Sequence, residues 1–220
     1  VIRGISQTYP QYSTQLTIEF CLPLSFLSDA YEEWPKRKDN MPSVGIGIDH
    51  PVAVRCIDAL TSRERRFKWQ QKWTHYKACR SVHPSRIEPA ICRSHEYSPG
   101  HIYRHYHLSE VFCMGLTETP PAPLNMHPSK SNPLTELFNA GIPIALWPRQ
   151  AAEEDNIHQI LYSLLHGGTP ESLPIRLRHA RSLAGDGDVV RTLTLLWDDY
   201  DRIPPQYRAL EEEAFDDLNL

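Results

Sequence analysis

The stretch of sequence that decides the fold class is Gly141-Ile142-Pro143-Ile144-Ala145-Leu146-Trp147-Pro148-Arg149. A glycine closes the amphipathic segment before it, five of the next six residues are apolar, and a proline then stops the run, leaving an arginine beyond the stop. A short and uninterrupted apolar strand is typical of α/β sheets, because helices cover both faces of such a strand. The stretch therefore predicts a buried strand in an α/β domain. It supplies no catalytic residue.

Apolar patterns on both sides of this stretch predict that strands and helices alternate. Strands are expected at 16–22, 51–57, 110–116, 141–147 and 189–197, and helices at 24–34, from 61 or 62 past 76, at 133–140, 151–166 and 173–184. Residues 35–50 and 117–131 are interpreted as loops, and 80–109 have too weak a periodicity to assign. This alternation predicts a single α/β domain with a mainly parallel sheet layered by helices.

The helix after the second strand carries aromatic residues at helical spacing. Trp69, Trp73 and Tyr76 recur at i, i+4 and i+7, so they form one apolar stripe that is expected to face the core. Solvent exposure is expected for the polar residues beside that stripe, which are Arg63, Arg66, Gln70 and Lys77. A base-stacking platform needs exposed aromatics beside its charges, so any affinity for nucleic acid is expected to be weak and non-specific.

Charged residues are distributed unevenly along the chain, although the net charge is only −4. Residues 55–93 hold ten Lys and Arg against three Asp and Glu, whereas residues 198–220 hold two Arg against eight acids. One interpretation is a solvated helix face and an acidic tail. The other is a basic surface for an acidic partner or nucleic acid, which the chain's own tail could cover. The candidates for partner contact are Arg63, Arg66, Lys72, Arg149, Glu211, Glu212 and Glu213. The expected organisation is a linker at 1–13, the domain at 14–205 and an acidic tail at 206–220.

The composition of the chain argues against a membrane-spanning protein and against a disulfide-rich one. The chain of 220 residues is 40% hydrophobic and 23% charged, as in ordinary soluble domains, and no apolar run is long enough to span a membrane. The start at Val1 has no signal-peptide pattern and suggests a piece of a longer protein. Five scattered cysteines argue against a disulfide framework and favour a cytoplasmic location; they are Cys21, Cys56, Cys79, Cys92 and Cys113.

Two clusters of side chains are candidates for metal binding. The first is His101, His105 and His107, which share one face on a strand, whereas only the first two do so on a helix. No cysteine or acidic pair completes a zinc site by spacing, so a polar histidine cluster is the alternative. The second follows the last strand and holds Asp198, Asp199 and Asp201, which suit Mg²⁺ but equally suit capping of backbone amides.

Catalytic motifs are otherwise weak in this sequence. His107 and Cys113 in principle make a thiol dyad, but the His-Gly and Asp-x-Cys pairs of caspase-like proteases are missing. The sequence also lacks a G-x-S-x-G elbow, a Walker glycine loop and a G-x-G-x-x-G motif after a strand. We therefore assign no catalytic residue and expect no cofactor.

Three blocks of sequence, in this order and spacing, resemble one family. They are residues 16–23 (LTIEFCLP), residues 51–55 (PVAVR) followed by the Trp69/Trp73 helix, and residues 141–149 with the later LLWDD at 195–199. The chain resembles, over about residues 14–205, the C-terminal domain of vWA-MoxR associated proteins (VMAP-C), a component of bacterial NTP-dependent conflict systems.

The resemblance implies an organisation and no particular reaction. It implies a regulatory or sensing module that acts beside a MoxR-type AAA+ ATPase and a vWA protein in antiviral defence, with an effector domain, often a peptidase, attached at the N-terminus. We therefore expect a non-catalytic recognition module that binds a partner protein or a trigger and controls that effector. The alternative is a metal-dependent hydrolase that uses the aspartate or the histidine cluster.

Overall fold

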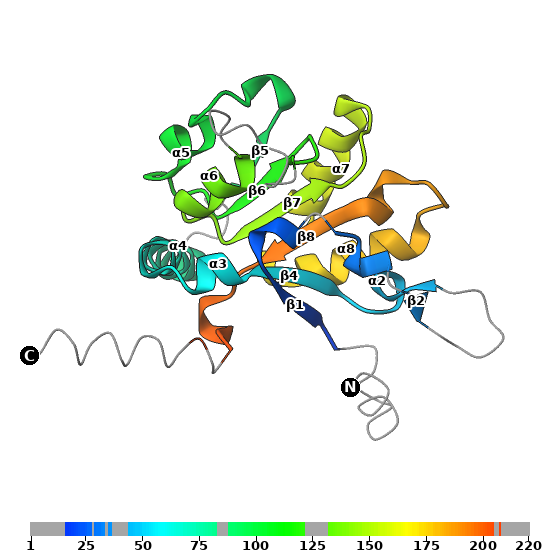
Figure 1. The fold of residues 1–220 in the computed structure, drawn as a ribbon, viewed down its shortest axis with the longest axis horizontal. Helices are drawn as coiled ribbons and strands as arrows, with labels where there is room; N and C mark the ends of the chain where they lie inside the picture. The colour runs from blue at the N-terminus through cyan, green and yellow to red at the C-terminus, as the bar shows by residue number, and fades with distance from the viewer. Residues whose placement is uncertain are drawn as a thin grey trace, which may run out of the picture.

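The apolar runs of the sequence form the centre of one six-stranded sheet in the computed structural model, which describes residues 16–27, 29–33, 35–36, 44–82, 88–121, 132–204 and 207. The sheet order is β1-β4-β8-β7-β6-β5, with β1 at Ile18–Leu22, β4 at Val52–Cys56, β5 at Ala90–Cys92, β6 at Cys113–Leu116, β7 at Ile144–Pro148 and β8 at Leu193–Trp197. Figure 1 shows these strands side by side across the molecule. The α/β class is confirmed.

Strand direction changes once across this sheet. The β1–β4, β4–β8, β7–β6 and β6–β5 pairs are parallel, whereas β7 and β8 run antiparallel, with Ile144 opposite Trp197 and Leu146 opposite Leu195. The sheet therefore consists of two parallel halves joined at its centre. The mainly parallel sheet is confirmed, and the antiparallel pair at its middle is an addition that strand patterns alone did not predict.

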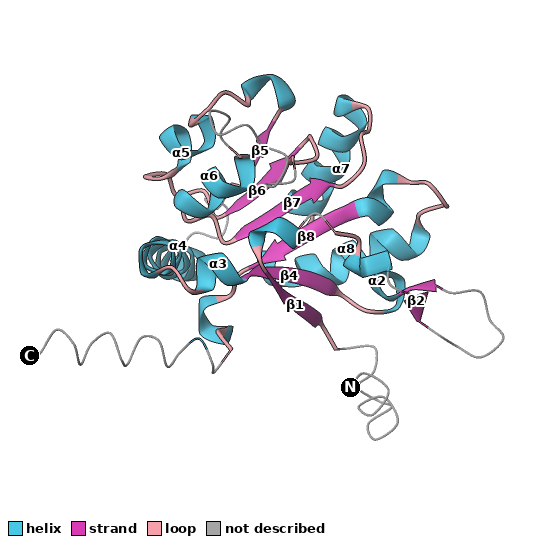
Figure 2. Cartoon of the chain, in the orientation of Figure 1, coloured by secondary structure: helices cyan, strands magenta, loops and turns pink. Residues whose placement is uncertain are grey.

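Helices cover both faces of the sheet, which explains why the central strands lack polar alternation (Figure 2). One face packs against α4 (Arg63–Val82), α7 (Glu154–His166) and α8 (Leu173–Leu183). The other packs against α5 (His101–Tyr106) and α6 (Pro133–Asn139). Adjacent residues of β7 divide between the two layers, since Ile144 and Leu146 lie in the first core and Ala145 and Trp147 in the second.

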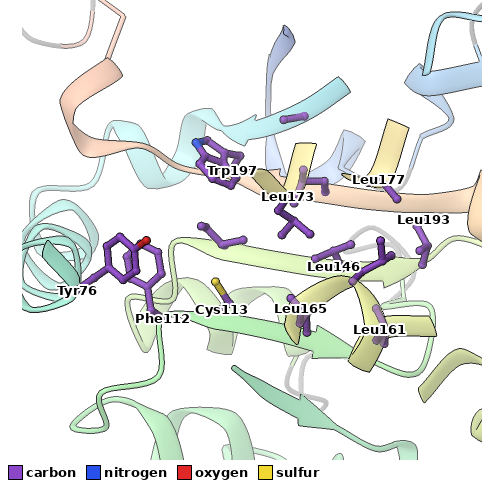
Figure 3. Close-up of a cluster of buried hydrophobic side chains, with 14 of the residues drawn as sticks. Tyr76, Phe112, Cys113, Leu146, Leu161, Leu165, Leu173, Leu177, Leu193 and Trp197 are labelled. Carbon is purple, nitrogen blue, oxygen red and sulfur yellow. The ribbon is translucent and has the colours of Figure 1, made fainter. Parts of the chain in front are cut away.

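The aromatic stripe of α4 belongs to the first core. Trp69, Trp73 and Tyr76 are at most 4% exposed, and Tyr76 stacks on Phe112 with ring centroids 4.2 Å apart. Figure 3 shows this end of the core, where Tyr76 and Phe112 lie near Cys113 and Trp197. The expectation that this stripe is core is confirmed, and its rings are not available for base stacking.

The connections hold more structure than the sequence predicted. The expected helix at 24–34 is two 3-10 turns, η2 (Leu24–Phe26) and η3 (Tyr31–Glu33). The expected loop at 35–50 contains the hairpin of β2 (Pro35–Lys36) and β3 (Val44–Gly45), and the short helix α2 (Ile46–Asp49). The unassigned 80–109 region contains β5, η5 (Ser94–Glu96) and α5.

Four further short elements complete the described chain. Helix α3 (Ile57–Leu60) links β4 to α4, and η7 (Pro170–Ser172) precedes α8. The first four residues of the expected strand at 189–197 form the 3-10 turn η8 (Val189–Thr192), and η9 (Tyr200–Arg202) follows β8. No helix in the described parts of the chain is long and apolar enough to cross a membrane.

Candidate recognition surface

The chain leaves the sheet at the end of β8 and turns onto α4, at the left of Figure 1. Trp73 on α4 donates a buried hydrogen bond of 2.6 Å from its Nε1 to the carbonyl of Asp198. The side chain of Arg55, at the end of β4, donates to the carbonyls of Asp199 and Arg202, the first at 2.6 Å. One buried indole and one buried guanidinium therefore hold the start of the C-terminal segment, defined here as residues 198–204 and 207.

Further contacts hold this segment along α4. Lys77 forms an ion pair with Asp201, and Arg66 donates a hydrogen bond of 3.2 Å to the carbonyl of Tyr207. Asp201 thus meets the C-terminal half of α4, while Tyr207 meets its N-terminal half. The segment runs back along the helix, and basic side chains of α4 contact it at both positions.

Beside the C-terminal segment, α4 presents an exposed stripe at i, i+4, i+7, i+11 and i+14. We call this the α4 stripe; it consists of Arg63, Phe67, Gln70, Thr74 and Lys77. Phe67 is 58% exposed and lies on this stripe between Arg63 and Gln70. Sequence reasoning missed Phe67, although the same helical spacing that placed Trp69 and Trp73 inside places it outside.

The candidates for partner contact separate into exposed and internal residues. Arg63 is exposed on the α4 stripe, whereas Arg66 is buried, because it points toward the C-terminal segment. The expected exposure of Arg66 is therefore wrong.

Lys72 is buried too, and its ammonium donates to the carbonyls of Tyr106 and Ser109 at 2.9 and 2.7 Å. Burial lowers the pKa of Lys72 to about 8. Glu211, Glu212 and Glu213 lie outside the described residues.

Arg149 belongs to a buried ionic cluster at the other end of the sheet. Its guanidinium pairs with Glu32 and Glu33, the second at 2.8 Å, and only 8% of its side chain is exposed. Burial raises the pKa of Glu32 against the opposing effects of Arg181 and Arg149. A cavity of about 320 Å³ adjoins this cluster and is lined by Glu32, Glu33 and Arg181 among others. Its mixture of both charges favours no single class of ligand.

The three aspartates after β8 point to three different partners. Asp198 is 2% exposed, and its Oδ1 lies 3.7 Å from Nε of Arg55. Asp199 caps η9 by accepting a hydrogen bond of 3.0 Å from the amide of Asp201, and Asp201 pairs with Lys77. The structure does not bring their carboxylates together around one ion position, and each has a structural role.

The histidine cluster forms only in part. His101 and His105 lie on one face of α5 with ring centroids 4.3 Å apart, as a helix requires. His107 lies apart from them, because it stacks on Tyr103 and contacts that residue's carbonyl at 2.7 Å. Cys113 lies in the core and does not join them. The donor atoms that do lie near His101 belong to Cys92 and Glu96, all within 4.8 Å of one another.

The thiol dyad of His107 and Cys113 does not form either. Cys113 is 5% exposed in the middle of the first core, and burial strongly raises the pKa of its thiol. His107 is the half-buried residue that follows α5, and its Nδ1 contacts the carbonyl of Tyr103. A protonated and enclosed thiol without a nearby base does not act as a nucleophile.

The family model of the vWA-MoxR associated protein C-terminal domain matches residues 1–200. Searches of curated proteins and of solved structures gave no match. The matched range contains the whole sheet, its covering helices and the start of the C-terminal segment. The chain therefore belongs to the VMAP-C family, whose name associates it with vWA-MoxR systems.

Proposed function

We propose that this chain is a non-catalytic recognition module of a bacterial vWA-MoxR conflict system. In this proposal it binds the vWA protein or the MoxR-type ATPase, and binding controls an effector domain attached before the linker at residues 1–13. The observation that carries the proposal is the position of the C-terminal segment, which lies along α4 directly beside the exposed α4 stripe.

The chemistry of the α4 stripe suits an acidic protein surface with an apolar pocket. Phe67 offers a large exposed ring, and Arg63 and Lys77 offer positive charge at the two ends of the same stripe. Aromatic anchors supply much of the binding energy of protein interfaces, while surrounding charges mainly set association rate and specificity. The pairing of Lys77 with Asp201 is an internal example of an acidic group docking on this helix.

The acidic tail fits the same proposal as a charge-based regulator of the surface. Residues 206–220 continue directly from the C-terminal segment, which already follows α4, and they carry five acids against one arginine. In this proposal the acidic tail competes with an acidic partner for the α4 stripe. We also propose a cytoplasmic location, because all five cysteines are free, as in a reducing compartment.

The direct test compares two apolar truncations of equal exposure. Phe67→Ala removes the ring from the α4 stripe, and Ile175→Ala removes a side chain that is 57% exposed on α8. We expect Phe67→Ala to weaken binding to the vWA protein or the ATPase at least tenfold, which is about 1.4 kcal/mol, and Ile175→Ala to leave it unchanged. Equal affinities for both variants and the wild type would contradict the proposal.

The alternative of a metal-dependent hydrolase retains one supporting observation, which is that His101 lies next to Cys92 and Glu96, with the ring of His105 beside that of His101. The aspartate cluster gives it no support, since its carboxylates have separate partners. Metal-dependent hydrolysis of a peptide or phosphodiester that is lost in His101→Ala would favour this alternative. Loss of this hydrolysis in Asp199→Asn, with the fold intact, would favour a hydrolase that uses the aspartate cluster.

A further inference from the structure

Three side chains from consecutive elements converge between β5 and α5. Cys92 is the last residue of β5, Glu96 the last of η5 and His101 the first of α5. Their sulfur, oxygen and nitrogen donor atoms all lie within 4.8 Å of one another. We propose that Cys92, Glu96 and His101 bind one divalent ion of the zinc class, with His105 as the fourth ligand. This proposal is independent of the recognition surface on α4.

The donor set selects this class of ion. A thiolate and an imidazole are preferred by zinc and related transition metals, whereas Mg²⁺ and Ca²⁺ prefer oxygen donors. Tetrahedral zinc with bonds of about 2.0–2.3 Å holds its ligands roughly 3.3–3.6 Å apart. Side-chain shifts of about 1 Å would therefore close the three donors onto an ion.

His105 is positioned to complete the site. It lies one helical turn after His101, on the same face of α5, and the two rings are 4.3 Å apart. Rotation of the His105 side chain would replace its contact with the His101 ring by coordination of the ion. Three or four protein ligands are what zinc sites use, with an open fourth position in catalytic sites and a closed one in structural sites.

Neighbouring groups hold the ligands in place. The backbone amide of Arg93 donates to Glu96 Oε2 at 2.7 Å, which fixes one carboxylate oxygen. The carboxylate of Glu136 accepts from the amides of Gly100 and Ile102 at 2.5 and 3.0 Å, so α6 sets the start of α5 and thereby His101. Such hydrogen bonds orient the ligands of metal sites and contribute to their affinity.

A cavity borders one ligand of the proposed site. It has a volume of about 280 Å³, lies beside His101 and is lined in addition by Tyr97, Ser98, Pro99, Ile102, Pro133 and Glu136. Cys92 is fully buried, so its sulfur is the innermost of the three donors. An ion in this cavity would therefore meet His101 first.

A bound ion would join short elements of this part of the chain. Residues 80–109 show weak apolar periodicity, and within them β5 is only three residues long and α5 only six. Cys92 and Ile102 anchor these short elements in the second core, and a bound ion would add a further link between them. An ion shared by β5, η5 and α5 would join all three.

The test uses zinc and cobalt alone with the 220-residue chain after treatment with a chelator. We expect one zinc per chain, and with Co²⁺ a sulfur-to-metal charge-transfer band that disappears in Cys92→Ser. The matched control is Cys79→Ser, since Cys79 lies 3.1 Å from His75 Nε2 and is the competing Cys–His pair. We expect that control to keep the band.

Substitutions on α5 and η5 test the other ligands and remain informative if Cys92→Ser does not fold. Affinity for zinc is expected to fall at least tenfold in His101→Ala and in Glu96→Gln. It is expected to stay unchanged in His107→Ala, because His107 follows α5 and its ring stacks on Tyr103. Zinc is also expected to raise the melting temperature of the wild type and not that of His101→Ala. Absence of stoichiometric zinc, or a cobalt band that depends on Cys79, would overturn the proposal.

Discussion

Arg55 and Asp198 form a pair inside the domain, with Nε and Oδ1 3.7 Å apart and their side chains 0% and 3% exposed. The pair connects the ends of two neighbouring parallel strands, β4 and β8. The same guanidinium also donates to two carbonyls of the C-terminal segment. Arg55 therefore links the sheet to the segment that follows α4.

Removing Arg55 is expected to destabilise the domain strongly. Arg55→Met removes the guanidinium from Asp198 and from the carbonyls of Asp199 and Arg202, and buried polar groups left without their donor cost about 1–3 kcal/mol each. Urea denaturation measures the loss in the free energy of unfolding. The control is Arg202→Met, because Arg202 is 53% exposed and pairs with Glu19 at the surface, where we expect less than about 1 kcal/mol. Similar losses in both variants would contradict the role of Arg55.

Stability is expected to depend on pH through Asp198. Burial raises the pKa of Asp198 to about 7, against the opposing effect of Arg55, from an ordinary value of 3.8. Between these values the folded chain binds more protons than the unfolded chain, so the free energy of unfolding falls as the pH rises and levels off above about 7. Asp198→Asn should reduce this slope. The pKa of Glu32 is raised as well, so part of the slope remains in Asp198→Asn. An unchanged slope in chemical denaturation across this range would refute the assignment.

A charge in the centre of β7 is expected to unfold the domain. Ile144 is fully buried opposite Trp197, and Ile144→Asp places an unpaired carboxylate there at a cost of several kcal/mol, against a total stability of roughly 5–15 kcal/mol. Ile175→Asp is the matched control, because Ile175 is exposed on α8. Circular dichroism and denaturation compare the two. A cooperative, soluble Ile144→Asp variant would count against the buried central strand.

The turn before β7 requires glycine at position 141. Gly141 has a φ of +72°, and a Cβ there would meet the Cβ and carbonyl carbon of Lys68 at 2.8 and 3.0 Å. Gly141→Ala is therefore expected to cost about 1–3 kcal/mol. Gly185→Ala is the control, since a Cβ at Gly185 has open space. Thermal melts that show the same small effect for both variants would exclude this requirement.

The strands that carry the fold were predictable because each is a dense apolar run. β1, β4, β7 and the apolar part of β8 lie where alternation or continuous hydrophobicity placed them, and α4 and α7 lie where residues recur at helical spacing. The antiparallel β7–β8 pair was not predictable, because strand direction is set by tertiary packing, which local patterns do not encode. β5 was missed because a strand of three residues gives too little periodicity.

Site residues were harder to predict than strands, because their environment depends on distant parts of the chain. The basic character of α4 was evident, but the burial of Arg66 and Lys72 depends on Tyr207, Tyr106 and Ser109, which are distant in sequence. In the same way, His101 was a candidate ligand from its spacing, whereas Cys92 and Glu96 join it only through the fold of β5 and η5.

In the proposed function, the domain binds the vWA protein or the MoxR-type ATPase at the α4 stripe, and the charge of the acidic tail regulates this binding. The direct measurement is the association rate with the vWA protein or the MoxR-type ATPase at two ionic strengths. The test variant changes Glu211, Glu212 and Glu213 to Gln; the control neutralises three exposed acids elsewhere, as Glu153→Gln, Asp155→Asn and Asp186→Asn. We predict a faster association at low ionic strength and a steeper salt dependence for the tail variant only, with folding intact. Rates that match the wild type at both ionic strengths would contradict the account.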